Sequence, residues 1–396
     1  MGIAFCISKP AAAASAFVAQ EKTAARRCDL DWLRIIAFGL LIFYHMGMFF
    51  VTWDWHVKSA HAGPAIEPLM LLTSPWRLSL LFLIAGAATR FMAEKTPSIA
   101  LLRARSKRLL LPLILGMLVI VPPQTFLEIT EKLGWDGGVL AFYRLYLTGY
   151  DGWHPNGHRL IVPTWNHLWF VAYLWVYTMT LLALRPWLHA ASERGWMRMA
   201  AARLTAPGIL LLMLPVLLAF RLGLRPRFPE THALLDDWYL HAEYFTLFLF
   251  GYAIARNGAV WQAIERLRWP ALIVALGCYA TIAWAMLRHV AVAGSLRDVV
   301  WTLDQWAWIV MLLGFARRRL DHDNAARRYL TDAVFPFYIL HQTVIVTIGH
   351  ALKPFGLTAA EEAGIIVAAT VAACFAGYEI VRRSGPLRPF FGLKAA

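Results

Sequence analysis

The sequence predicts an all-α protein, a polytopic bundle of about ten transmembrane helices with both termini in the cytoplasm. Three observations lead to this class. Apolar residues make up 59% of the 396 residues, charged residues only 16%, and the mean hydropathy is +0.54. Apolar stretches of roughly 18 to 22 residues recur along the chain, which is long enough to cross about 30 Å of hydrocarbon. Basic residues gather in every second connection between these stretches.

The predicted spans divide the chain into a membrane domain and its connections. They begin near Leu33, Leu69, Leu109, Trp165, Pro207, Trp238, Pro270, Val299, Asp332 and Ala363. Prolines leave the ends of the second and third spans the least defined. We expect residues 1–28 to form a disordered cytoplasmic tail and residues 29–393 a single membrane domain. The connection 131–164 is rich in Gly, Trp and His, and we expect it to form a lid or rim outside the membrane.

Orientation follows from the basic residues, which favour the cytoplasmic side of a membrane. With the N-terminus inside, one side receives the Lys and Arg residues of both terminal segments and of the connections 93–108, 185–206, 256–268 and 317–328. The opposite connections are neutral or acidic. The formal charge of +14 is then explained by topology and by attraction to anionic lipid. We therefore expect the lipid bilayer as a partner, and no nucleic acid.

Two ionisable residues lie within the first span, in the segment DLDWLRIIAFGLLIFYHMGMFF. Arg34 and His45 are eleven residues apart, so on an α-helix they share one face and lie about 16 Å apart along the axis. Ionisable residues within a span are costly and mark functional sites. This pair is therefore the expected centre of the site. Asp31, three residues before Arg34, offers a simpler ion pair, and that alternative stays open.

Other ionisable residues extend this pattern. His56, eleven residues after His45, is expected on the same helix face near the outer surface. Arg105 and Arg108 share a face in the 93–108 connection and are suited to phosphate oxygens, which guanidinium groups bind bidentately. The positive-inside bias alone would also account for them. Arg77, early in the second span, is expected to snorkel or to line a polar cavity, and His341 lies midway through the ninth span.

The loop histidines and the cysteines do little to define the site. His154 and His158 lie in the 131–164 connection and are further candidates with no partner indicated by spacing. The four cysteines show no spacing typical of a zinc site, so no metal site is predicted.

Several short motifs occur in an order that resembles acyltransferase family 3, a family of polytopic inner-membrane acyltransferases. The group most similar to this chain is the one that succinylates periplasmic glucans. The motifs are Arg-x10-His (Arg34, His45), Trp-His-Val (His56), an Arg before LFLIAGAA (Arg77), Arg-x-x-Arg (Arg105, Arg108), His-Leu-Trp-Phe (His167–Phe170), FLFGYAIAR (Phe250, Gly251), Phe-Tyr-Ile-Leu-His (Phe337–His341) and Tyr-Glu (Tyr378, Glu379). The resemblance runs from about Asp29 to Leu393.

The resemblance implies transfer of a succinyl or acetyl group from cytoplasmic acyl-CoA to a hydroxyl of an extracytoplasmic glycan. It implies a bacterial inner-membrane enzyme that has no bound cofactor and uses acyl-CoA as co-substrate. His45 would be the general base, or would carry the acyl group covalently. Arg34, with Arg105 and Arg108, would grip the phosphates of CoA. His341, Arg77 and His56 would orient His45 or bind the acceptor.

A transporter or flippase for a glycan or a lipid-linked sugar is the alternative, because charged residues within spans also serve substrate paths. Two observations argue against it. The sequence shows no internal repeat, and we expect no Asp or Glu near the middle of any span. A non-enzymatic membrane scaffold would leave the alignment of Arg34 with His45 unexplained.

Overall fold

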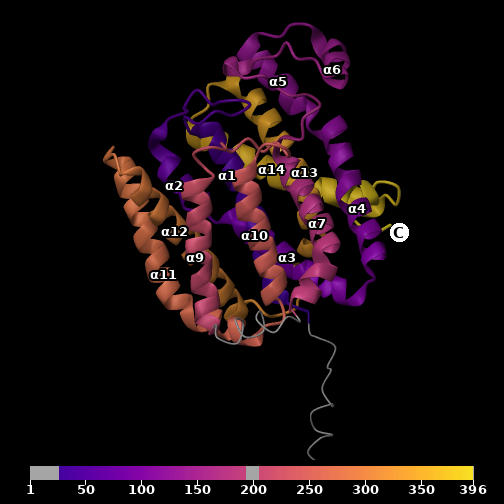
Figure 1. The fold of residues 1–396 in the computed structure, drawn as a ribbon. Coiled ribbons are helices and arrows are strands. Elements are labelled where there is room, and N and C mark those ends of the chain that lie inside the picture. Colours follow the sequence, from indigo (N-terminus) through magenta and orange to yellow (C-terminus); the bar gives the residue numbers. More distant parts are fainter. Residues whose placement is uncertain (1–25, 193–204, 396) are drawn as a thin grey trace, which may run out of the picture.

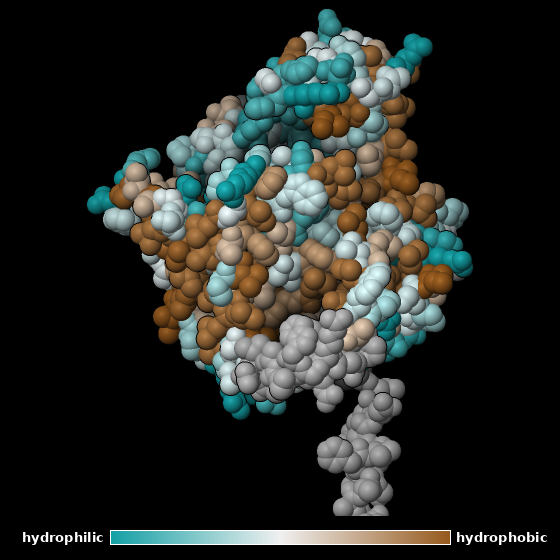
Figure 2. Space-filling view, viewed as in Figure 1, coloured by the Kyte–Doolittle hydropathy of each residue, from teal (hydrophilic) through white to brown (hydrophobic). Residues whose placement is uncertain are grey.

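The computed structural model describes residues 26–192 and 205–395, and all regular secondary structure within them is helical. Eight helical segments of this described part are long and apolar enough to cross a membrane. They contain α1 (Cys28–Phe50), α4 (Ser98–Leu115) with α5 (Pro122–Leu133), α7 (Trp169–Ser192), α9 (Ala206–Gly223), α11 (Gly258–Leu287), α12 (Gly294–Arg319), α13 (Ala325–Leu352) and α14 (Ala359–Arg383). The helices stand side by side as one bundle (Figure 1). An apolar band covers its middle, with hydrophilic surface at both ends (Figure 2). The chain is therefore a multi-pass membrane protein.

Two shorter helices, α3 (Arg77–Lys95) and α10 (Trp238–Ile254), form the centre of the bundle. They cross in backbone contact, because a Cβ atom on Gly86 would overlap the carbonyl oxygen of Phe248, and one on Gly251 would overlap that of Leu83. Small residues allow such close approach of membrane helices. The predicted second and sixth spans are thus interior helices.

Ion pairs distinguish the two ends of the bundle. At one end, which we call the basic end, Arg327 binds Asp31 at 2.5 Å and Arg256 binds Glu94 at 2.5 Å. At the other end, the cap end, Lys353 binds Glu131 at 2.9 Å. The N-terminus of α1 and the C-terminus of α14 both lie at the basic end, where Tyr329 of α13 donates a hydrogen bond to Glu379 at 2.8 Å.

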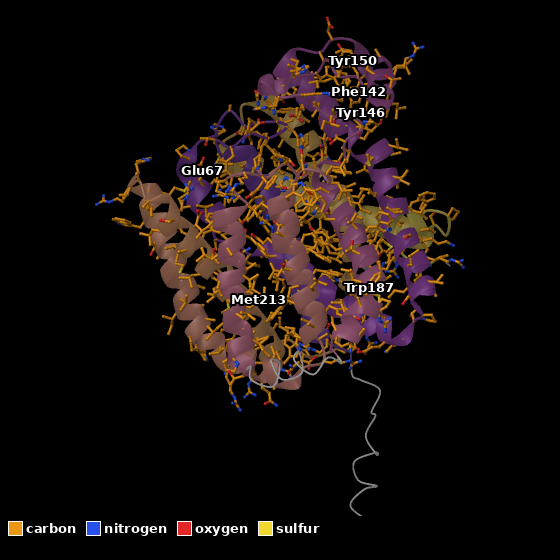
Figure 3. All side chains as sticks on the ribbon, in the orientation of Figure 1. Glu67, Phe142, Tyr146, Tyr150, Trp187 and Met213 are labelled. Carbon is orange, nitrogen blue, oxygen red and sulfur yellow. The ribbon has the colours of Figure 1, made fainter. Side chains whose placement is uncertain are left out.

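The cap end carries a small unit of its own. Helix α5 and helix α6 (Gly138–Thr148) lie there above the bundle (Figure 1). Phe142, Tyr146 and Tyr150 come together in this unit (Figure 3). The Phe142 ring stacks on Trp153 at 5.4 Å between centroids. The connection 131–164 is therefore partly helical and has its own aromatic core, which suits the predicted rim.

Several predicted boundaries are wrong. The second span begins at Arg77 rather than near Leu69, because a turn containing Pro75 separates α2 (Glu67–Leu71) from α3. Most of the basic 93–108 connection is helical, since α4 already begins at Ser98. The N-terminal half of α4 is charged, so its hydropathy is too low to predict a span there. Residues 1–25 of the predicted tail lie outside the described residues, and Cys28 already belongs to α1.

Candidate active site

Two predicted residues from distant parts of the chain meet near the cap end. His45, near the C-terminus of α1, and His341, on α13, bring their ring nitrogens Nδ1 and Nε2 to 2.8 Å. His341 is 1% exposed, whereas His45 is only partly buried. The ring of Trp55 stacks on His45 at 6.5 Å. His341, one of the candidates for orienting His45, therefore lies in contact with it.

The hydrogen bonds around His341 fix the direction of the pair. His341 Nδ1 lies 2.8 Å from the carbonyl oxygen of Tyr338 and 3.2 Å from that of Phe337. Carbonyl oxygens only accept, so Nδ1 carries the hydrogen, and the Nε2 of a neutral His341 must accept. His45 Nδ1 therefore donates to His341. The remaining nitrogen, His45 Nε2, keeps its lone pair and makes no hydrogen bond to any described residue.

A third histidine, which the sequence analysis quoted only as part of a motif, completes the cluster. The His167 ring lies edge-on to His341 at 5.2 Å. Its Nε2 donates to the carbonyl oxygen of Ile339 at 3.1 Å, and its buried Nδ1 has no partner among the described residues. Tyr338 in turn donates its hydroxyl to the carbonyl oxygen of His167. These bonds join the start of α7 to α13 and hold His341 from the side.

His56 does not continue the face of α1, because that helix ends at Phe50. It lies instead in a polar network at the cap end. His56 Nδ1 donates to Glu128 at 2.5 Å, and Gln342 donates to His56 Nε2 at 3.0 Å. Gln342 also donates to Gln124 at 3.0 Å. Both ring nitrogens of His56 are thus occupied, and the prediction of one helix face for all three residues is wrong.

A cavity of about 270 Å³ opens at the basic end between α1, α3, α4, α7 and α13. Arg34, Arg105 and Arg108 line it. Arg34 lies 3.8 Å from Asp31, so the simpler ion pair exists, but Asp31 is held more closely by Arg327. Arg105 is buried and donates to Thr89 at 2.8 Å. Neither Arg105 nor Arg108 forms an ion pair within the described residues, so the cavity presents cationic groups suited to an anion.

A second cavity of about 180 Å³ lies between α1, α13 and α14, and its lining is almost entirely apolar. His341 and Tyr338 line it. Phe38 and Val334 line both cavities and separate them. The Phe38 ring contacts Tyr338 at 5.2 Å and Phe170 at 6.0 Å between centroids. We call Phe38, Val334, Phe170 and Tyr338 the aromatic partition, since it stands between the arginines and the histidines.

The other ionisable residues fall elsewhere. Arg77 is buried at the start of α3 with its guanidinium over the Tyr44 ring, 3.9 Å from the centroid. His154 and His158 are exposed in the cap unit. The expectation of no acid near the middle of a span is wrong, since Asp304 of α12 is wholly buried and accepts from the Trp308 indole at 3.1 Å. Such an acid is tolerated because it faces the bundle interior.

Comparison with known proteins agrees with this arrangement. A family model described as an acyltransferase domain matches residues 29–379. Proteins named glucans biosynthesis protein C from Salmonella heidelberg and from Salmonella typhimurium are each 22% identical to the chain over 344 residues. These alignments cover 84% of the chain and 85% of each relative. No solved structure matches the chain.

Proposed function

This chain belongs to acyltransferase family 3, the membrane O-acyltransferases, and from that premise we propose that it moves an acyl group across the membrane. The donor is a cytoplasmic acyl-CoA, and the acceptor is a hydroxyl of an extracytoplasmic glycan. The relatives named for glucan biosynthesis support a glycan as acceptor. The bacterial inner membrane, which meets cytoplasmic acyl-CoA on one side, is the location that suits this reaction.

The observation that carries the proposal is the free lone pair of His45. The carbonyls of Phe337 and Tyr338 orient His341, and His341 orients His45 so that Nε2 is the accepting nitrogen. A general base needs this arrangement, in which a second group holds the ring and its tautomer in place. His45 is therefore the base, and His341 is a positioning residue.

These groups account for every bond and proton that changes in the transfer. As the acceptor oxygen attacks the thioester carbon, its proton passes to His45 Nε2, and the carbonyl oxygen becomes an alkoxide. The alkoxide then collapses, the carbon–sulfur bond breaks, and the leaving sulfur takes the proton back from His45. The products are the glycan ester and free CoA. The covalent alternative, in which His45 Nε2 first takes the acyl group, uses the same lone pair.

The arginine cavity supports the donor side. CoA carries several phosphate charges on a long arm, and guanidinium groups bind such charges through paired hydrogen bonds. Arg34, Arg105 and Arg108 meet at the basic end, which the positive-inside bias assigns to the cytoplasm. Two members of the aromatic partition, Phe38 and Val334, line both this cavity and the second one, which His341 also lines. The acyl end of a bound donor therefore has to pass Phe38 to reach His45.

The first prediction tests His45. In cells lacking the gene, a plasmid with His45→Gln should restore glycan acylation at least about 100-fold less well than the wild-type plasmid, because loss of a general base typically costs 10² to 10⁴ in rate. Mass spectrometry of the glucans and surface polysaccharides measures the ester. His61→Gln is the control, since His61 lies in the connection that follows α1, is exposed, and has a side chain that bonds, within the described residues, only to the Leu357 carbonyl oxygen. Near-normal acylation by a well-expressed His45→Gln protein would contradict the assignment.

A further inference from the structure

Arg77 is a buried cation with no counter-ion. Its side chain is 3% exposed, and no carboxylate of the described residues lies within 4 Å of it. Its one side-chain hydrogen bond runs to the Thr73 hydroxyl at 3.0 Å, and Nε has no partner in the described part of the chain. The equally buried Arg327 shows the usual solution, since Asp31 and Asp323 bind it at 2.5 and 2.7 Å.

An unpaired guanidinium in such a place is expensive. Burial of a charge costs several kcal/mol unless an opposite charge and hydrogen bonds offset it. The Tyr44 ring face offsets part of this cost through a cation–π contact. A ring face attracts the cation but leaves its N–H groups unused. The guanidinium of Arg77 therefore retains donors for an anion that arrives with a ligand.

The position of Arg77 connects it to the histidine pair. Its Cζ lies 3.9 Å from the centroid of the Tyr44 ring, which lies 5.8 Å from that of His45, so the guanidinium is within about 10 Å of the His45 ring. Arg77 is thus close enough to His45 for one substrate to contact both side chains.

We propose that Arg77 binds an anionic oxygen of the acyl group during transfer, an inference that rests on the acyl transfer proposed above. Two sources of that oxygen fit the space. One is the alkoxide that the thioester carbonyl becomes, and stabilising it would make Arg77 a catalytic residue. The other is the free carboxylate of a dicarboxylic acyl group, and binding it would make Arg77 a specificity residue.

Both sources are within reach of His45. The hydrogen bond from the attacking oxygen to His45 spans about 3 Å, and so does the one from the guanidinium to the alkoxide. The bonds between the two oxygens add about 2 to 3 Å, and a four-carbon chain lengthens the path by about 4 Å. The path to the alkoxide, about 8 to 9 Å, fits the limit of about 10 Å, whereas the carboxylate fits it when the acyl chain bends back toward the guanidinium. Comparing acyl groups with and without a carboxylate separates the two.

The experiment uses the full chain in lipid nanodiscs, with unsubstituted glucan as acceptor and either acetyl-CoA or succinyl-CoA as donor. If Arg77 binds the alkoxide, Arg77→Gln should lower the rate with both donors by 10² to 10³, as expected for loss of an oxyanion donor. If it binds the carboxylate, only the succinyl rate should fall, by roughly 10- to 100-fold for a lost charge-assisted bond. Rates within twofold of wild type for both donors would overturn the inference.

Two further variants serve as controls for this experiment. Arg221→Gln is the matched control, because Arg221 is also buried and lies over aromatic rings, those of Tyr239 and Trp301, but belongs to α9 and lines neither cavity. It should leave both rates unchanged. Arg77→Lys serves if Arg77→Gln does not fold, because lysine keeps the charge but not the two-pronged fork. A tenfold or greater loss with Arg77→Lys supports the inference, and wild-type rates overturn it. Wild-type transfer with either donor tests the proposed function separately.

Discussion

At the scale of single residues, the site depends on the direction of hydrogen bonds. Two carbonyl groups of α13 require a hydrogen on His341 Nδ1, so Nε2 of that ring is an acceptor. The 2.8 Å hydrogen bond between the rings then sets the tautomer of His45, with its hydrogen on Nδ1. In the described part of the chain, no acid forms an ion pair with His341, in contrast to His56, which is paired with Glu128. His45 therefore holds a proton only briefly, which suits a base that must return it to the leaving sulfur.

The arginine cavity gives a second prediction at this scale. Arg105→Gln combined with Arg108→Gln should weaken acyl-CoA binding by at least tenfold and reduce its dependence on salt, because charge-assisted phosphate contacts are lost. Binding of radiolabelled acyl-CoA to nanodiscs at two ionic strengths measures both effects. The control pair is Arg103→Gln with Lys107→Gln, two exposed residues of α4 that do not line the cavity. Equal effects of the two pairs would show that only the surface charge of α4 matters.

The residues differ in how far the sequence could predict them. Arg34 and His45 share one helix, so their spacing alone places them on one face. The 2.8 Å bond from His45 to His341 joins positions 296 residues apart, and no periodicity encodes such a contact. His167 was hidden for another reason. It stands in a short 3-10 turn, Asn166–Leu168, outside the apolar run of its helix, where neither hydropathy nor charge marks it.

At the scale of elements, the close crossing of α3 and α10 sets the geometry of the centre. We predict that Gly86→Ala and Gly251→Ala each destabilise the protein by about 1 to 3 kcal/mol, because the added methyl group must push two backbones apart. Thermal unfolding in detergent measures the change. Gly277→Ala on α11 is the control, since nothing lies within 4 Å of a Cβ at that position. A crossing that tolerated both alanines would mean that the two backbones are not in contact.

Helices were predictable where hydrophobicity covers their whole length. The run of α14 or of α1 is apolar nearly throughout, and its ends follow from the charges that flank it. The N-terminal half of α4 carries four basic residues, so hydropathy assigns it to a connection although its backbone is helical. A π-helical turn at Gly116–Ile120 joins α4 to α5, and the Val121 N–H donates there to the Gly116 carbonyl oxygen, five residues back, at 2.8 Å. Pro122 and Pro123 follow at once and have no N–H to offer the carbonyls of this turn.

At the scale of the whole molecule, the mechanism requires that the two ends face different compartments. We predict that a cysteine at Asn156, exposed in the cap unit, reacts with a membrane-impermeant thiol reagent in intact spheroplasts. A cysteine at Ala104, exposed on α4 at the basic end, should react only after lysis. The native cysteines are replaced by serine beforehand. The reverse pattern would place the arginine cavity on the side without CoA.

The aromatic partition has a consequence for the cell as well as for the enzyme. A protein that reached both faces of the bilayer through an open passage would let protons run down the gradient that powers the cell, at about 2.3 kcal/mol per charge for each 100 mV. Phe38 and Val334 line both cavities and stand between them, so the two do not form one open passage. Under the proposed mechanism the arm of the donor must displace these two side chains and occupy the space that they leave. The substrate itself then blocks the leak of protons while the acyl group crosses.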